Sequence, residues 1–242
     1  MYFSPLTTIF GSLLATTVIA LPHQQQTPTK IAPRQGFDLT QYHVPLSNGS
    51  QSLPSPNSTL KAITLGRGTQ NYTCKPSGTP TSVPVAVGAK ANLIDLSPLL
   101  AHPFFNSDAE SVVLDAVPAW FLNLADANTI IEFFKIVFNI ILDILGVHFF
   151  NDAGVPTFSL GDTGTLLGKK VGDIIAPANA DPGPGGQGPG AVDWLYLSQA
   201  PGSEGLSSVY RVETAGGKPP KSCDGQPDDI EVQYAALYWF YE

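Results

Sequence analysis

From Leu60 onward, hydrophobic and polar residues alternate over short segments that are separated by clusters of Gly, Pro, Asp and Asn. Alternation with a period of two places successive side chains on opposite faces of a strand. Many short strands with such turn signals, and without regular strand–helix alternation, predict a mainly β fold, an antiparallel β-sandwich or barrel. The expected strands cover residues 60–74, 83–87, 91–96, 147–150, 157–160, 192–197, 208–213 and 231–241.

The first and last of these strands show which side chains should be buried. In the first strand, the alternation directs Tyr72 and Cys74 inward and Asn71, which lies between them, outward. The last strand ends in YAALYWFY and is apolar on both faces. This pattern predicts a central, buried strand. A platform on which sugars stack is the alternative interpretation.

The segment 107–145 breaks the alternation and predicts two helices, inserted into the β domain as a helical hairpin. Each helix begins with a capping box, in which Ser107 or Thr129 is followed three residues later by Glu. Pro118 should kink the first helix, and Gly146 should end the second helix.

Polar residues of the second helix fall in one stripe about 80° wide at about 100° per residue: Glu132, Lys135, Asn139 and Asp143. Because these side chains would lie inside a bilayer, we expect an amphipathic helix and no membrane span. The helical hairpin then has two interpretations. It packs on the β domain, or it presents a hydrophobic surface to a lipid, a cell-wall component or a second copy of the chain, in self-association.

The N-terminal segment predicts export. An apolar run ends in small residues, and Val18 and Ala20 suit the −3 and −1 positions of a signal-peptidase site. We therefore expect a cleaved signal peptide at residues 1–20. A flexible leader rich in Pro, Gln and Ser should follow at 21–58 and bury little of its surface. Residues 59–242 should form a single β domain that carries the helical insertion.

Composition narrows the class of protein. Of the 242 residues, 43% are hydrophobic and 13% are charged, and the net charge is −8. Nucleic-acid binding needs a basic surface, so this function is not expected. Asn-x-Ser/Thr triplets predict glycosylation at Asn48, Asn57 and Asn71. In an oxidising compartment Cys74 and Cys223 are expected to pair, and two buried thiols are the alternative.

Motifs for cofactors and metals are weak or missing. Gly66-Arg67-Gly68 precedes a strand instead of a helix, so we interpret it as punctuation at the start of a strand, not as a dinucleotide loop. A formal GxGxxG at 183–188 lies among prolines that preclude a helix. The sequence has no HExxH, CxxC or GxSxG motif. We therefore expect no cofactor and no metal.

Two catalytic arrangements stay open. His148 lies among aromatic residues on an expected strand, where a histidine is more often structural than catalytic. A glycosidase would instead need two carboxylates that face one sugar at a defined separation. The candidates lie near the later strands: Asp193, Glu204, Glu213, Asp228, Asp229 and Glu231.

Five motifs follow one another along the chain: Gly68-x-Gln70-x-Tyr72-x-Cys74, Gly146-Val147-His148-Phe149-Phe150, Val192-Asp193-Trp194-Leu195, YRVETAGGKPP at 210–220 with Cys223, and Tyr234-x-Ala236-x-Tyr238-x-Phe240. Over about residues 60–242, the chain resembles a secreted fungal and bacterial family catalogued as domain of unknown function 3455. Fungal members are often labelled malate dehydrogenase. The sequence does not support this label, because it has no Rossmann unit and no coupled His/Asp/Arg substrate site.

The resemblance also implies where a pocket would lie. Residues that match the family motifs and mix polar with aromatic character are expected to line it: Gln70, Tyr72, His148, Trp194, Arg211 and Thr214. We expect an uncharacterised secreted glycoprotein, extracellular or in the cell wall, that binds a carbohydrate or a small apolar ligand without catalysis. The alternative is a secreted hydrolase that acts on a carbohydrate or an ester.

Overall fold

The computed structural model describes residues 38–102, 110–124 and 126–242. The chain divides after Gly36 into two units, and all described residues belong to the second unit. The predicted signal peptide at 1–20, the first part of the leader and the expected helix start at Ser107 lie outside the described residues.

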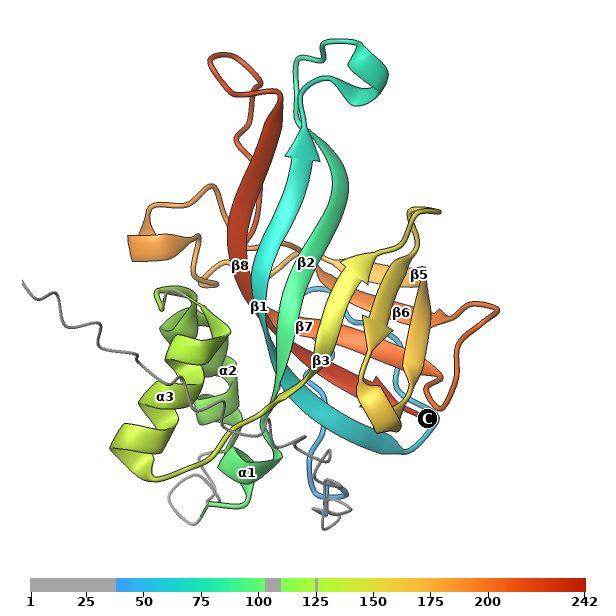
Figure 1. Cartoon of the computed structure of the whole chain (residues 1–242), viewed down its shortest axis with the longest axis vertical. Coiled ribbons are helices and arrows are strands. Elements are labelled where there is room, and N and C mark those ends of the chain that lie inside the picture. Colours follow the sequence, from blue (N-terminus) through green and yellow to red (C-terminus); the bar gives the residue numbers. More distant parts are fainter. Residues whose placement is uncertain (1–37, 103–109, 125) are drawn as a thin grey trace, which may run out of the picture. The chain divides into compact units, whose positions relative to one another are not determined.

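Eight antiparallel strands form a closed barrel, in which each strand pairs with its neighbours in sequence and β8 pairs with β1 (Figure 1). The predicted antiparallel β fold is confirmed, and of the two expected forms it is the barrel. Closure gives each strand of the barrel a partner on both sides. The strands are β1 (Leu60–Thr73), β2 (Val85–Asp95), β3 (Ile144–Phe150), β4 (Pro156–Ser159), β5 (Thr165–Ile174), β6 (Trp194–Gln199), β7 (Ser208–Gly216) and β8 (Asp229–Tyr241).

Two strands differ from the expected set. The segments 83–87 and 91–96 belong to one strand, β2, because the chain stays paired with β1 through Gly88 and Ala89. Strand β5 is missing from the expected set. Its sequence, TLLGKKVGDI, interrupts the hydrophobic positions with glycines and charged residues, so it shows no simple alternation.

The two faces of the barrel wall carry separate cores. On β8, Tyr238 and Phe240 point into the barrel interior, where they pack with Phe158 of β4. The intervening Leu237 and Trp239 point outward into a second core, which the helices and the leader cover. All five side chains are buried, so the prediction that the last strand is buried on both faces is confirmed.

Gly66 and Gly68 lie inside β1 and not at its start, so their interpretation as strand-entry punctuation is wrong. A Cβ atom on Gly66 would lie 2.4 Å from the Tyr238 ring, and one on Gly68 would lie 1.8 Å from the Lys90 carbonyl oxygen. Only glycine fits these positions, because β8 side chains and the β2 backbone come too close for a side chain. The two glycines shape the barrel wall.

The helices are α1 (Ser97–Leu100), α2 (Glu110–Leu122) and α3 (Ala127–Phe138), with short 3-10 turns η1 (Pro76–Gly78), η2 (Gly161–Thr163) and η3 (Pro184–Gly186). Helices α2 and α3 form a hairpin within the predicted insertion, and α2 contacts β1, β7 and β8 (Figure 1). The capping residue of α3 is Asp126 and not Thr129, so the predicted capping box is wrong: the Asp126 carboxylate accepts a hydrogen bond from the Thr129 amide.

Helix α3 ends at Phe138, before the predicted end at Gly146. Asn139 adopts a left-handed conformation with φ of 54°, and its amide donates a hydrogen bond to the Phe134 carbonyl. Asparagine is the second choice after glycine for this kind of helix end. Asn139 and Asp143 therefore do not extend the polar stripe of the helix.

The second part of the leader is packed against the barrel. Four of its side chains are buried in the outer core: Leu39, Tyr42, Val44 and Leu53. The Pro54 carbonyl accepts a hydrogen bond of 2.9 Å from the Tyr210 hydroxyl. The expectation of little core burial is therefore wrong for residues 38–58. A few apolar residues, widely spaced in a polar segment, suffice to fasten it.

Cys74 and Cys223 form a disulfide with their Cα atoms 5.8 Å apart, so the predicted pairing is confirmed. It joins the end of β1 to the loop between β7 and β8. Among the glycosylation acceptors, Asn57 is exposed, and Asn48 and Asn71 are half-buried. Glycosylation itself stays a prediction. Within the described ranges, no helix has the length and the apolar character needed to span a bilayer.

Candidate functional site

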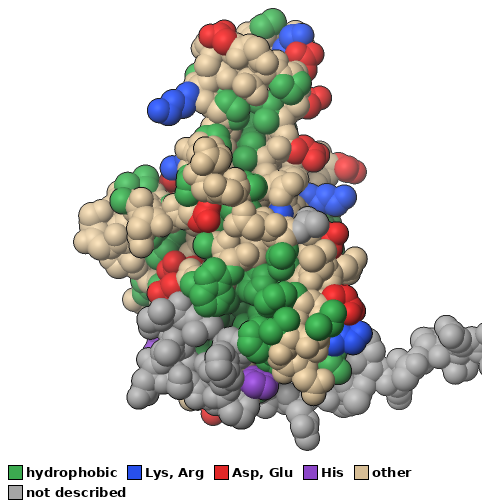
Figure 2. Space-filling view, turned by 90° about the vertical axis from the view of Figure 1, so that its left-hand side faces the viewer, with side chains coloured by type: hydrophobic (Ala, Val, Ile, Leu, Met, Phe, Trp, Pro, Cys, Tyr) green, Lys and Arg blue, Asp and Glu red, His purple; other side chains and the backbone are tan. Residues whose placement is uncertain are grey.

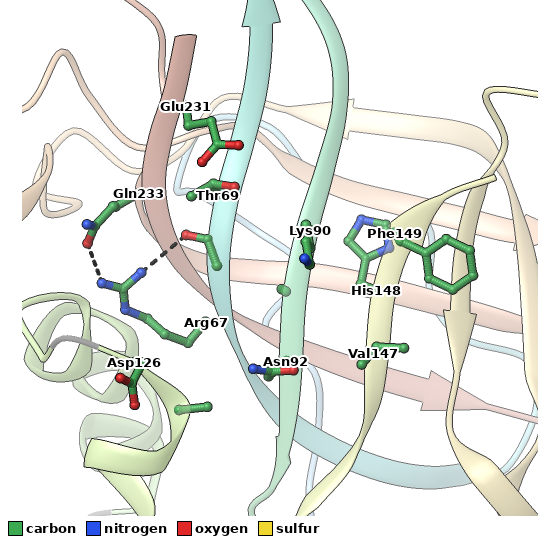
Figure 3. A pocket seen from close by; sticks show the side chains of 13 residues that line it. Arg67, Thr69, Lys90, Asn92, Asp126, Val147, His148, Phe149, Glu231 and Gln233 are labelled. Carbon is green, nitrogen blue, oxygen red and sulfur yellow. Dashed lines mark hydrogen bonds between the residues drawn. The ribbon is translucent and has the colours of Figure 1, made fainter. Parts of the chain in front are cut away.

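A groove of about 520 Å³ lies on the outer face of β8, β1, β2 and β3, beside the N-terminal end of α3 (Figure 3). The barrel strands form its floor, and α3 borders it. The groove is open to solvent and mainly polar in its side chains. The polar side chains are Arg67, Thr69, Lys90, Asn92, Asp126, His148, Glu231 and Gln233.

The register of the barrel strands brings these side chains together. Residues that pair across antiparallel strands place their side chains on the same face. Thr69 pairs with Lys90 on one side and with Gln233 on the other, and Arg67 pairs with Asn92. Adjacent cross-strand rows therefore present polar groups to the same groove.

Arg67 forms the floor of the groove and fastens the helical hairpin to the barrel. Its guanidinium donates hydrogen bonds of 2.9 Å to the Leu122 carbonyl and 3.0 Å to the Leu124 carbonyl, at the end of α2, and a further one to the Gln233 side chain. Burial lowers the pKa of Arg67, while the nearby Asp126 carboxylate acts in the opposite direction. Arg67 is thus occupied with protein partners, and its first role is structural.

Three exposed side chains of the groove are available to a ligand. Lys90, Asn92 and Glu231 make no side-chain hydrogen bond or ion pair with any residue that the structure describes. Lys90 and Asn92 lie on β2, and Glu231 lies on β8, so they flank β1 from both sides (Figure 3). An ammonium donor, an amide and a carboxylate acceptor together can bind groups that both donate and accept hydrogen bonds.

Four of the six predicted pocket residues point into the barrel interior, and one of them, His148, also borders the groove. Gln70 and Tyr72 come from β1, His148 from β3 and Arg211 from β7. The Arg211 guanidinium donates a hydrogen bond of 2.8 Å to the Asp193 backbone carbonyl, and its charge acts on Tyr72 and on His148. The structure therefore brings these four together as an interior polar cluster.

Trp194 and Thr214 do not join the interior cluster. Leu195 pairs with Arg211 and therefore shares its face of the barrel wall. The adjacent Trp194 lies on the opposite face and is buried in the outer core. The Thr214 hydroxyl donates a hydrogen bond to the Val192 carbonyl. Both residues line a second hollow of about 500 Å³ beside α2. The six predicted residues thus divide between the two faces of the barrel wall.

The second hollow contains Glu213, one of the carboxylates considered for catalysis. Glu213 lies at a register shift in β7 and has a φ of 46°. Burial, and then the charge of Asp115, raises the pKa of Glu213 to about 8. A carboxyl group that is protonated near neutral pH can donate a proton. Among the described residues, no group of three or more His, Cys, Asp or Glu could hold a metal ion.

His148 is buried in the barrel interior, with only 4% of its surface exposed. Its ring stacks on Phe158 with the centroids 4.1 Å apart, and its Nδ1 lies 3.0 Å from the Thr157 carbonyl oxygen. Burial, and to a lesser extent the charge of Arg211, lower the pKa of His148 to about 4, although the hydrogen bond with Thr157 acts in the opposite direction. The imidazole is therefore neutral and enclosed, and a hydrolase mechanism that relies on it finds no support.

Protonation of His148 should make the protein less stable in acid. In the unfolded chain the pKa of histidine is about 6.5, so the unfolded state binds a proton at a higher pH than the folded state does. The contribution of neutral His148 is then complete above about pH 6.5. It should fall by about 3 kcal/mol as the pH drops to 4. Urea unfolding of wild type and His148→Gln at pH 4 to 7.5 measures this difference.

In that comparison, the His148→Gln variant should lose less stability between pH 6.5 and pH 4, because glutamine does not titrate. The carboxylates titrate in both proteins and cancel in the difference. Parallel curves for the two proteins would show that His148 does not stay neutral in the folded state.

The sequence reasoning did not identify the groove residues Arg67, Lys90 and Asn92. A signal for the groove is present on β8, where the outward positions change from Glu231 and Gln233 to the apolar Leu237 and Trp239. This change marks the point at which the outer face of the barrel ceases to be exposed and becomes covered. The groove lies at that boundary.

Comparison with known proteins gives a family but no activity. A family model described as Protein of unknown function (DUF3455) matches residues 54–242. No curated protein and no solved structure matches the chain.

Proposed function

We propose a function from the geometry of the groove, because the chain belongs to the DUF3455 family, whose description assigns no function. The protein is a non-catalytic extracellular binding protein, and its ligand is hydroxyl-rich, an oligosaccharide of the cell wall. The observation that carries this proposal is the convergence of Lys90, Asn92 and Glu231 in one groove, where they are exposed and have no hydrogen-bond or ion-pair partner among the described residues.

The chemistry of the groove suits neutral sugars. Each sugar hydroxyl both donates and accepts hydrogen bonds, and the groove offers donors, acceptors and an amide that is both. Lys90 and Glu231 carry opposite charges, so these two side chains favour neither an anion nor a cation. The Phe149 ring also lines the groove and is 37% exposed, which provides an apolar surface for the face of a sugar ring.

The covalent chemistry of the chain supports an extracellular location. The Cys74–Cys223 disulfide is typical of proteins that fold in an oxidising compartment. The exposed acceptor Asn57 would be accessible to a glycan. These features agree with the predicted signal peptide, and mass spectrometry of protein secreted by a eukaryotic host would reveal cleavage after residue 20 and the occupied acceptors.

Isothermal titration of the secreted protein with neutral oligosaccharides of glucose, mannose and N-acetylglucosamine tests the proposal. Asn92→Ala and Glu231→Ala should each weaken binding by about tenfold, since a hydrogen bond contributes about 1 kcal/mol or more to binding. Gln199→Ala, an exposed amide on β6 outside the groove, is the matched control and should bind like wild type.

Two outcomes would contradict this assignment. If wild-type protein bound none of the oligosaccharides, the proposed function would be wrong. If Asn92→Ala bound as tightly as wild type, the groove would not be the binding site. New reducing ends in the titrated samples would favour the alternative, a hydrolase, for which the protonated Glu213 beside Asp115 is the candidate acid.

A further inference from the structure

A third cavity lies in the helical hairpin, away from the groove and the second hollow and chemically unlike the groove. It measures about 220 Å³. Helices α2 and α3 form its sides, and Leu99 of α1 contributes a third wall. The side chains that line it, from Val117 and Trp120 on α2 to Phe133 and Phe138 on α3, are all hydrocarbon except for the indole nitrogen of Trp120. The cavity is therefore unsuited to a sugar, whose hydroxyls would find no partner there.

The mouth of this cavity opens on a hydrophobic surface. Trp120 is 57% exposed, Phe133 is 39% exposed and both line the cavity. Ile136 and Val137 extend the apolar surface along α3. Figure 2 shows hydrophobic side chains gathered on the face of the molecule that contains the hairpin. Large exposed apolar side chains that adjoin an apolar cavity are typical of a ligand site.

Contacts within the protein hold the walls of the cavity in place. Phe121 of α2 packs on Phe134 of α3 with ring centroids 5.0 Å apart, and Phe133 packs on Phe138 at 6.0 Å. Arg67 ties the end of α2 to the barrel, which holds the hairpin in place. The walls of the apolar cavity are therefore fixed by ring packing and by hydrogen bonds to the barrel.

Size and charge restrict the occupant. At about 30 Å³ per heavy atom, the share that a water molecule takes in the liquid, the cavity holds roughly seven heavy atoms. An unbranched chain of about that many carbons fits between the helices. The only ion pair described on α3, Glu132 with Lys135, is internal to the helix, and the chain carries a net charge of −8. Lys135 is therefore already paired with Glu132, and the negative net charge of the chain repels anions, so an anionic head group finds no counter-charge.

We propose that this cavity binds the hydrocarbon end of an uncharged single-chain amphiphile, such as a fatty alcohol or a monoacylglycerol, with its hydroxyl head group outside in water. The proposal does not depend on sugar binding in the groove. A second copy of the chain, or a membrane, would instead use the exposed hydrophobic face as a whole and would not need the cavity.

Titration of the full secreted protein with unbranched 1-alkanols from butanol to dodecanol tests the proposal by calorimetry. Affinity should rise by about fourfold for each added methylene, the factor that corresponds to burying one such group, and should level off near seven or eight carbons. Alkanoates of the same length should bind more weakly at pH 7 because their carboxylate carries a negative charge.

Two variants and a control separate the cavity from the surrounding face. Val117→Phe fills the cavity and should abolish the dependence on chain length. Trp120→Ala removes a partly exposed wall, leaves the buried core intact and should weaken octanol binding by about tenfold. Ile136→Ala is the control, since this side chain is 78% exposed and does not line the cavity. It should bind octanol like wild type.

Three results would overturn the proposal. Affinity that rises without levelling off to dodecanol would indicate partition onto a surface and not filling of a cavity. Equal affinity of wild type and Trp120→Ala would exclude this cavity. The third result combines two measurements. If wild type bound no alkanol, and if sedimentation showed that wild type dimerises with rising concentration while Ile136→Ala does not, the hydrophobic face would be assigned to self-association.

Discussion

Replacement of Arg67 by leucine should lower the free energy of unfolding by about 3–5 kcal/mol, because it leaves buried carbonyl groups without donors at about 1–3 kcal/mol each. Those carbonyls belong to Leu122 and Leu124 at the end of α2, with a longer contact to the Tyr234 carbonyl. A buried cation in this position also complements the negative end of the α2 dipole. Urea denaturation at pH 7 measures the loss.

The matched control for Arg67→Leu is Lys90→Met. Lys90 lies on the neighbouring strand in the same groove, yet it is exposed and has no described partner, so its replacement should change stability by about 0.5 kcal/mol or less. Limited proteolysis adds a local readout, since Arg67→Leu should make the helical hairpin more accessible than the barrel strands. Equal stability losses in the two variants would show that Arg67 does not hold the hairpin.

Replacement of both Cys74 and Cys223 by alanine should lower the free energy of unfolding by about 2–5 kcal/mol, the usual effect of losing a native disulfide. The crosslink spans 149 positions, so it excludes many extended conformations of the unfolded chain. Urea denaturation of the double variant, compared with oxidised wild type, measures the loss. Both cysteines are replaced together so that no free thiol remains to link two molecules.

Reduced wild-type protein is the internal control for the disulfide. It should unfold at the same urea concentration as the double variant, because both lack the crosslink. If the double variant matched oxidised wild type instead, the pairing of β1 with β8 would by itself account for the stability of this end of the barrel.

Much of the fold could be predicted because local pattern and tertiary environment agree. In β8, the apolar run from Tyr234 to Tyr241 coincides with burial on both faces of the strand, and in the first strand the inward phase of Tyr72 and Cys74 matches their burial. The prediction failed where a local signal was ambiguous. Asn139 could serve as a polar helix residue or as a left-handed helix end, and in the structure it is the helix end.

The candidate site was less predictable than the fold. Arg67 lies between two glycines, and nothing near it in sequence shows that its partners are Leu122 and Leu124 in the helical hairpin. Trp194 and Arg211 were expected in one pocket, but whether two residues share a face depends on strand register, and β6 and β7 place them on opposite faces. Contacts between residues far apart in sequence therefore determine which side chains lie together in the candidate site.

Strand β8 is the last strand of the barrel to be synthesised, and it pairs with both β7 and β1. While it is missing, a nascent chain that already contains β1 to β7 has two open sheet edges, and such edges pair readily with other chains. A premature stop before Asp229 would therefore produce a sheet that joins its neighbours instead of a barrel that closes on itself. Synthesis of this one strand therefore decides between a closed barrel and an open sheet that aggregates.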